Sequence, residues 1–239
     1  MKLHLENDFY LDGISAKSLG ICLQRALTLS APVPVTESVQ VPGRNGTVVI
    51  STGAYKNRSG LAECFALQKD VIGKINEINR FLFASVGYRR LEISGDDDHF
   101  LMAKVKNGAQ IAPRLQTLNP FEIAFDCKPQ RFLKSGENTL TFTMPGDFLN
   151  IYGFPAKPIV KAYGNGEGTV TIGDTTVRIL DMEDHIILDC DTMNAYKGSL
   201  NQNLYINAPE FPTLESGTNA VSFSGGITKI EITPRWWEL

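Results

Sequence analysis

The chain has 239 residues, enough for one large or two small domains, and its 43% hydrophobic and 21% charged residues are ordinary for a soluble globular protein. The 23 basic and 26 acidic residues give a net charge of −3 without a long basic stripe, which argues against direct binding to nucleic acid. No apolar run of about 18 residues occurs, and Glu6 and Asp8 place acids near the amino terminus, so we expect no membrane span, no signal peptide and synthesis in the cytosol.

Glycine, proline and cysteine usage narrows the fold class. The 21 Gly and 12 Pro are spread along the whole chain, which favours many short strands and turns, and therefore a mainly β protein. The four cysteines lie far apart and form no Cys-x-x-Cys pair, so we predict reduced core residues without a disulfide or metal role. They are Cys22, Cys64, Cys127 and Cys190.

The first 50 residues are predicted to form strands. Residues 3–6 alternate between apolar and polar side chains, and residues 20–29 continue such a pattern over a longer stretch. Residues 38–41 and 47–50 are the expected strands of a hairpin. Asn45-Gly46 lies between them and is suited to a tight hairpin turn.

One segment, about residues 68–86, has a helical period. Its apolar residues recur at spacings of three and four, with charged residues on the other faces. Asp70 favours the helix start and Gly87 is a suitable stop, whereas Gly73 inside costs about 1 kcal/mol relative to Ala. Packing against a sheet must compensate for that cost. The apolar positions are Val71, Ile72, Ile75, Ile78, Phe81 and Leu82.

Further strands are predicted on both sides of a domain boundary near residue 134. Before it, strands are expected around the polar turn 95–98, and residues 121–127 alternate as a strand with one buried face. Residues 128–136 are basic, contain Pro and Gly, and break that pattern. Beyond them the chain has no helical period, which favours a β-sandwich. The expected strands span residues 90–94, 100–105, 140–144, 158–163, 169–172, 176–180, 185–188, 204–206, 220–223 and 228–233.

Two glycine-rich or acidic segments invite a binding function. Residues 164–168 read Gly-Asn-Gly-Glu-Gly, but no helix follows as a phosphate-binding loop requires, so we predict a hairpin turn. Residues 96–98 lack the alternation of a calcium loop and are predicted to form a solvated turn. The acids within residues 181–191 bracket one predicted strand; surface charge is the main interpretation, and a cation site remains the alternative.

Catalytic motifs are missing from the sequence. His4, His99 and His185 are widely separated, and no Gly-x-Ser-x-Gly elbow or Cys-His signature occurs. Paired carboxylates of a glycosidase could converge only in the fold, and nothing in the sequence supports them. We therefore predict no catalytic, cofactor-binding or metal-binding residues, and a protein that is not an enzyme.

The aromatic residues at the end of the chain are candidates for an interface. Trp236 and Trp237 are adjacent, so on a strand they face opposite sides, one into the core and one outward. The outward indole suits subunit packing, with glycan contact as the alternative. Arg235 could form an ion pair across an interface or remain solvated.

Five features, in this order along the chain, resemble those of the distal tail proteins of siphophages. They are Phe9-Tyr10-Leu11-Asp12-Gly13, the loop Val41-Pro42-Gly43-Arg44-Asn45-Gly46, the predicted helix, the pattern from Phe121 through Phe125 and Cys127 to Pro129, and a closing signature. The closing signature joins Phe211-Pro212-x-Leu214, Gly217-x-Asn219 and Pro234-Arg235-Trp236. Asn45 replaces the more usual acid of the family, which preserves the turn but loses a charge.

The resemblance implies a fold and a structural function. It implies an amino-terminal belt domain, residues 1–134, that closes into a hexameric ring, and a galectin-like β-sandwich, residues 135–239. Such a ring is a hub that connects the tail tube to tail-tip and receptor-binding proteins at the virion tail tip, in a phage or prophage product made in the bacterial cytoplasm. Candidate assembly residues are Arg44, Asn45, Arg235, Trp236 and Trp237.

A carbohydrate-binding module is the competing hypothesis. In it, the β-sandwich would recognise host wall glycan through Trp237 or Tyr196. A galectin-type site needs His, Asn, Arg, Trp and Glu on adjacent strands, and the second half offers a single His and tryptophans only at its end. A wall hydrolase is the third hypothesis.

Overall fold

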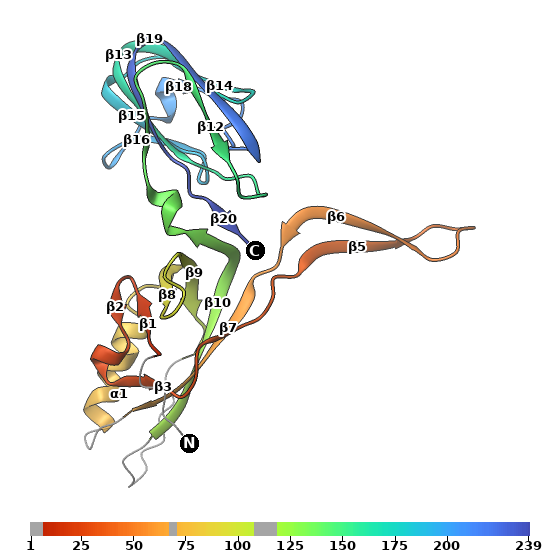
Figure 1. Cartoon of the computed structure of the whole chain (residues 1–239), viewed down its shortest axis with the longest axis vertical. Coiled ribbons are helices and arrows are strands. Elements are labelled where there is room, and N and C mark those ends of the chain that lie inside the picture. The colour runs from red at the N-terminus through yellow and green to blue at the C-terminus, as the bar shows by residue number, and fades with distance from the viewer. Residues whose placement is uncertain (1–6, 67–70, 108–118) are drawn as a thin grey trace. The chain divides into compact units, whose positions relative to one another are not determined.

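The computed structural model describes residues 7–66, 71–107 and 119–239. The chain forms two compact units, Met1–Arg131 together with Leu239, and Phe132–Glu238. Each unit has its own sheet and its own hydrophobic core (Figure 1). The protein is mainly β, as its composition predicts.

The first unit is built on one sheet with the strand order β2-β1-β8-β9-β10-β7-β3, and β4 pairs with β7 beside this path. A separate two-stranded sheet, β5 with β6, belongs to the same unit. The strands are β1 (Phe9–Leu11), β2 (Ile14–Ser15), β3 (Ile21–Leu23), β4 (Thr28–Leu29), β5 (Pro34–Gln40), β6 (Thr47–Tyr55), β7 (Arg58–Ala66), β8 (Arg89–Ile93), β9 (His99–Val105) and β10 (Asn119–Leu133).

Alternation along β7 and β10 forms the core of this unit. Ala62 and Cys64 of β7 face the same side as Ile123 and Phe125 of β10, and all four are buried. The helix α1 (Val71–Leu82) and the short 3-10 helix η1 (Lys17–Leu19) accompany the sheet, and Ile78, Phe81 and Leu82 of α1 join the same apolar cluster. The predicted packing of one helix against a sheet is confirmed.

The helix ends four residues before the predicted end, and Gly87 is not its stop. Arg89 caps the carboxyl terminus of the helix, because its Nη1 donates to the carbonyl of Phe81 at 2.7 Å and lies 3.5 Å from that of Leu82. Its Nε also donates to Asp12 Oδ2 at 2.6 Å. The last carbonyls of a helix often accept hydrogen bonds from the backbone of a turn that contains glycine. Here the guanidinium of Arg89, from the next strand, donates those hydrogen bonds instead. Asp70, predicted near the helix start, lies outside the described residues.

Other local expectations also need correction. The strand predicted for residues 20–29 is two short strands, β3 and β4, that pair with different parts of β7. The strand β7 itself and the hairpin of β1 and β2 were not expected from the sequence. The strand predicted for residues 3–6 lies outside the described residues.

The second unit is a β-sandwich made from one curled sheet. Its strand order is β11-β19-β13-β15-β16-β17, while β12 pairs with β19 and β14 pairs with β13 and β18. The 3-10 helices η2 (Lys134–Glu137) and η3 (Asn203–Tyr205) complete it. The strands are β11 (Leu140–Phe142), β12 (Gly146–Asn150), β13 (Ile159–Ile172), β14 (Thr175–Ile179), β15 (Glu183–Asp189), β16 (Asn194–Lys197), β17 (Leu200–Asn201), β18 (Ile206–Asn207) and β19 (Gly217–Thr233). The short strand β20 (Trp237–Glu238) follows β19 in the chain and is not part of this sheet.

The sheet curls because β13 and β19 are long strands that bend together. The first half of β13 pairs with β15 and its second half pairs with β14, while β19 follows it on the other side throughout. The pairing register with β19 shifts around Gly164 and Gly168. The bend brings Val160 and Ile186 of one half into the same core as Val177 of the other half.

The predicted hairpin turn at residues 164–168 is wrong, since these residues are the irregular middle of β13. Glycine is required there because two backbones touch: a Cβ on Gly164 would lie 1.9 Å from the carbonyl oxygen of Gly226, and one on Gly226 would lie 1.8 Å from that of Asn165. The hairpin turn falls instead at Gly173, between β13 and β14.

The prediction of core cysteines is correct for three of the four, and Cys22 is only partly buried. All four cysteines are free, and three of them are buried. Burial raises the pKa of the Cys64 and Cys190 thiols to about 12 and that of Cys127 to about 11, so these thiols remain protonated. Among the described residues, no helix is long and apolar enough to cross a membrane.

Candidate assembly surfaces

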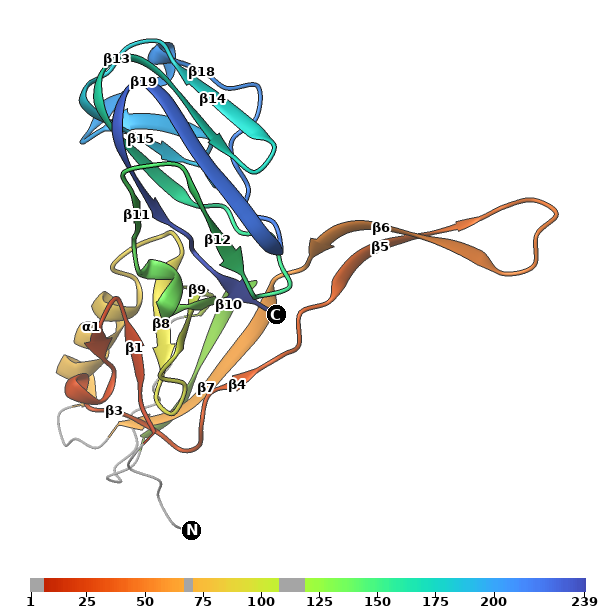
Figure 2. The same cartoon turned by 45° about the horizontal axis from the view of Figure 1, so that its top comes forward.

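A two-stranded hairpin without a core beneath it is the most unusual surface of the first unit. It consists of β5, β6 and the loop 41–46, and we call residues 34–55 the arm. In both views it extends away from the sheet of its own unit (Figures 1 and 2). Nearly all of its side chains are exposed. An isolated hairpin is at best marginally stable in water.

The two faces of the arm differ in polarity. Val39 lies opposite Val48, and Glu37 lies opposite Ile50, so these four side chains share one face. The other face carries hydroxyl and amide groups, with Val49 as its one apolar member; it comprises Thr36, Ser38, Gln40, Thr47, Val49 and Ser51. Ile50 is 50% exposed. Exposed β-branched residues on one side of a hairpin are typical of a surface that a partner covers.

The tip of the arm differs from the predicted tight turn. The last pair of the ladder is Gln40 with Thr47, so a six-residue loop connects the strands. The Arg44 amide donates to the carbonyl of Val41 at 3.1 Å, with Pro42 and Gly43 between them and Gly43 at a φ of 80°. Proline followed by a positive-φ glycine suits a type II turn. Arg44 and Asn45 are exposed, and Arg44 is the single cation of the arm.

The root of the arm is fixed to the sheet by polar contacts. The Lys56 amide donates to the carbonyl of Val33 at 2.8 Å, which closes the hairpin at its base. Asn57 Nδ2 then donates to the Tyr88 hydroxyl at 2.6 Å and to Asp126 Oδ1 at 3.1 Å. Lys104 Nζ lies 3.2 Å from Asp126 Oδ2. The arm therefore leaves the sheet from an anchored base.

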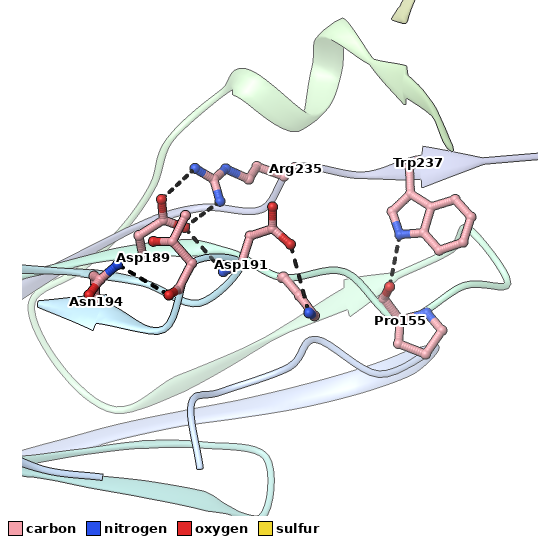
Figure 3. Close-up of polar contacts among 8 residues, drawn as sticks. Pro155, Asp189, Asp191, Asn194, Arg235 and Trp237 are labelled. Atoms are coloured by element: carbon pink, nitrogen blue, oxygen red, sulfur yellow. Dashed lines mark hydrogen bonds and ion pairs between the residues drawn. The ribbon is translucent and has the colours of Figure 1, made fainter. Parts of the chain in front are cut away.

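Arg235 has a partner inside the second unit. Its Nη1 lies 2.6 Å from Asp189 Oδ1 and its Nη2 lies 3.3 Å from Asp189 Oδ2 (Figure 3). The backbone of Arg235 has a φ of 58°, so the chain turns sharply between β19 and β20. This two-bond geometry joins the end of β15 to the segment before β20. Arg235 therefore forms an ion pair inside its own unit.

Both indoles have contacts within the second unit, and both pack against its hydrophobic core. Trp236 is 8% exposed and packs near Phe148 and Tyr152, with ring centroids 6.1 and 5.9 Å away. Trp237 is partly exposed and stacks on Phe154 with centroids 4.6 Å apart. Its Nε1 donates to the carbonyl of Pro155 at 2.9 Å (Figure 3). One face of the Trp237 ring is thus already occupied.

The earlier part of the closing signature is also explained by folding. Asn219 is buried, and its Nδ2 donates to the carbonyls of Glu215 and Gly217 at 2.8 and 3.0 Å. Its Oδ1 accepts from the Glu215 amide at 2.9 Å. Leu214 is fully buried, and its carbonyl accepts a hydrogen bond from Asn150 Nδ2. This signature therefore holds the loop before β19 in place.

Several acids of the two acidic segments are paired with cations. Burial alone would raise the pKa of Asp96, but hydrogen bonds from Arg131 and His99 lower it. The carboxylate of Asp191 lies 3.7 Å from Lys157 Nζ, and Asp189 is held by Arg235. Within the described residues, no group of three or more His, Cys, Asp or Glu side chains is arranged to hold a metal ion.

Sequence reasoning found the hairpin but missed the importance of its apolar face. The signal was present, because Val39 and Val41 alternate before the loop and Val48 and Ile50 alternate after it. Between residues 34 and 55, only Glu37 and Arg44 carry charge. Strand edges that remain in solvent usually carry more protective charge, so this composition already indicates a covered hairpin.

The fold is similar to that of a solved phage protein. The crystal structure of the SPP1 Dit (gp 19.1) protein, described as a paradigm of the hub adsorption apparatus in phages infecting Gram-positive hosts, matches with a TM-score of 0.71 at 10% sequence identity. The match covers 96% of this chain and 99% of the SPP1 protein. No protein-family model and no curated protein sequence matches the chain. The two proteins therefore share a fold over nearly their whole lengths.

Proposed function

We propose that this protein is a structural component of a phage tail tip, a hub that forms a hexameric ring between the tail tube and the tail-tip and receptor-binding proteins. The observation that carries the proposal is the fold shared with the SPP1 hub protein over nearly both entire chains. The motif order in the sequence points to the same family independently. The protein acts by assembly, without catalysis and without a cofactor.

The arm supports an assembly function on physical grounds. Its exposed apolar face leaves β-branched side chains in water, which is unfavourable in a monomer and favourable once a partner covers them. The partner we infer is a neighbouring copy, because an arm that projects from one place and binds at another produces a head-to-tail contact. Head-to-tail contacts close into a ring when the rotation between subunits permits.

The two parts of the chain have different functions in the proposed ring. Residues 1–134 form the ring, with Arg44 and Asn45 at the tip of the arm among the assembly residues. Residues 135–239 form a galectin-like sandwich that extends outward, and Arg235, Trp236 and Trp237 support assembly by shaping that sandwich. The ring is located at the virion tail tip after production in the cytoplasm of the bacterial host. The net charge of −3 suits a ring that lets DNA pass rather than holds it.

Negative-stain electron microscopy of the purified protein over a range of concentrations tests the proposal. Six-fold rings with a central hole are the expected result, either alone or after addition of the tail tube protein. Single particles under both conditions would overturn the ring. Glycan binding that Trp237→Ala abolishes would instead favour a carbohydrate-binding module, and turnover of wall glycan would favour an enzyme.

A further inference from the structure

Asn-Gly dipeptides occur three times in the sequence, and the fold holds them in different ways. They are Asn45-Gly46, Asn107-Gly108 and Asn165-Gly166. In such a pair the backbone nitrogen of the glycine can attack the asparagine carboxamide, because glycine has no side chain that obstructs the approach. The reaction needs a carboxamide and a glycine amide that no other group holds in place. The hydrogen bonds around each pair therefore indicate where the reaction can occur.

The Asn-Gly pair of the second unit is held at both reacting groups. The Gly166 amide, which would be the nucleophile, donates to the carbonyl of Met182 at 2.8 Å. Asn165 Oδ1 accepts a hydrogen bond from the Asp184 amide at 3.1 Å. The Asn165 backbone is also paired in register with Glu183 in the sheet. The nucleophile and the carboxamide are therefore both fixed, although Asn165 is exposed to solvent.

The carboxamide of Asn107 is fixed at both of its polar atoms. Its Nδ2 donates to the carbonyl of Glu122 at 3.2 Å, and its Oδ1 accepts from the Ala124 amide at 2.6 Å. Gly108 lies outside the described residues. The Asn107 carboxamide must lose two hydrogen bonds before it can rotate toward a nucleophile, so local opening has to precede any reaction there.

Asn45, at the tip of the arm, is held by neither kind of contact. Asn45 and Gly46 are both exposed. Within the described part of the chain, the Asn45 carboxamide forms no hydrogen bond and the Gly46 amide donates to no carbonyl. Gly46 has a φ of 81°, close to the 78° of Gly166, so the conformation of the glycine does not distinguish the two sites. The difference between them is the hydrogen bonding of the reacting groups.

We propose that Asn45 is a site of spontaneous deamidation in the free subunit, and that the reaction gives the neutral arm a negative charge. The Gly46 nitrogen forms a bond to Asn45 Cγ, the Cγ–Nδ2 bond breaks, and ammonia leaves with the proton that the Gly46 nitrogen gives up. Water then opens the cyclic imide at either of its carbonyls and produces aspartate or isoaspartate at position 45. Water is the only co-reactant, and no electrons are transferred.

The new charge is significant because the arm carries so little charge of its own. Glu37 and Arg44 are the only charged residues between positions 34 and 55, and their charges cancel. Deamidation therefore leaves the arm with a net negative charge, on a carboxyl that is ionised at neutral pH. The carboxylate adjoins Arg44 in the chain, where it can pair with the guanidinium within the same loop. The isoaspartate product also lengthens the loop backbone by one carbon.

The reaction does not depend on the proposed ring. It requires the exposed loop of a single chain, and a neighbouring molecule that covers the loop would slow it. Fresh and aged subunits would then differ in the charge of the arm before they assemble, while the two cores stay the same.

Peptide mapping by mass spectrometry tests the site in the intact chain. Dilute wild-type protein is kept at neutral pH and physiological temperature, and samples are digested at mildly acidic pH, where the reaction is slow. We expect deamidation at Asn45 to be at least about tenfold faster than at Asn165, because the hydrogen-bonded pair must first open. Deamidation at Asn45 that is no faster than at Asn165 would overturn the proposal.

A denatured sample shows whether the fold causes the difference. Without the sheet, the Gly166 amide loses its hydrogen bond to Met182, so Asn45 and Asn165 should react at similar rates. A tenfold difference that persists in denaturant would assign it to the local sequence and would overturn the structural argument.

Ion-exchange chromatography with two variants measures the charge change itself. Wild-type protein should develop a more acidic form with time, and Asn45→Gln should not, because the longer side chain disfavours closure of the ring. Asn138→Gln is the matched control, since Asn138 is also exposed but precedes a threonine, and it should still develop the acidic form. Unchanged thermal unfolding verifies the fold of both variants. An acidic form that accumulates equally in Asn45→Gln would place the reaction elsewhere and reject Asn45 as the site.

Discussion

Arg235 and Asp189, 46 residues apart in sequence, are joined by two hydrogen bonds between one guanidinium and one carboxylate (Figure 3). Arg235 occupies a left-handed backbone position just before the buried Trp236. The ion pair thereby fixes the turn that sends one indole into the core and the next onto Phe154. Arg235, a candidate assembly residue in the sequence, therefore also determines the local fold.

Removal of this pair is expected to destabilise the second unit. Arg235→Ala leaves Asp189 partly buried without its main partner, and we expect a loss of about 2 kcal/mol in the free energy of unfolding. Chemical denaturation monitored by tryptophan fluorescence measures it. Arg178→Ala is the matched control, because the Arg178–Glu167 pair is largely exposed and is expected to contribute less than about 0.5 kcal/mol. Equal losses in the two variants would contradict this assignment.

The same pair predicts a pH dependence. Burial alone would raise the pKa of Asp189, but the hydrogen bonds and charge of Arg235 outweigh it and leave the pKa lowered. A carboxyl whose pKa is lower in the folded state stabilises the fold fully above its unfolded pKa of about 3.9, and the contribution is lost as the pH falls through the folded pKa. Unfolding midpoints between pH 7 and pH 3 should therefore fall less steeply for Asp189→Asn than for wild type. Parallel slopes would show that Asp189 is not a source of the acid sensitivity.

The local sequence pattern predicted most of the helices, strands and turns that depend on residues close together in the chain. The helix around Ile78, the strand from Phe121 to Cys127 and the hairpin around Arg44 all follow from periodicity and turn chemistry, which act over a few residues. The failures involve partners distant in sequence. Arg89 ends the helix from the following strand, and Asp189 captures Arg235 from 46 residues away.

The bend of the sandwich could not be predicted from the sequence, because it also depends on residues that are distant in the chain. Gly-Asn-Gly-Glu-Gly reads as a hairpin turn when only its own residues are considered. Its role becomes visible only against Gly225 and Gly226 of β19, about 60 residues later, where the two backbones meet.

Steric contact at the bend makes Gly226 irreplaceable. Gly226→Ala places a Cβ 1.8 Å from the carbonyl oxygen of Asn165, so β13 and β19 must separate there. We expect a loss of about 3 kcal/mol or more, or failure of the second unit to fold. Gly153→Ala is the control, since it too lacks a left-handed φ and its Cβ would meet nothing within 4 Å. Circular dichroism during thermal unfolding compares the two, and a tolerated Gly226→Ala would contradict the close approach.

Two substitutions at adjacent positions distinguish the contributions of the two faces of the arm to assembly. Val39→Asp puts a charge on the apolar face, where it opposes burial against a neighbouring copy, whereas Ser38→Asp puts the same charge on the hydroxyl-rich face. We expect Val39→Asp to abolish rings in negative stain and Ser38→Asp to retain them. Because both side chains belong to the exposed arm, neither variant should change the thermal unfolding of the monomer by more than about 0.5 kcal/mol. If Ser38→Asp disrupted the rings while Val39→Asp preserved them, the arm would bind through its opposite face.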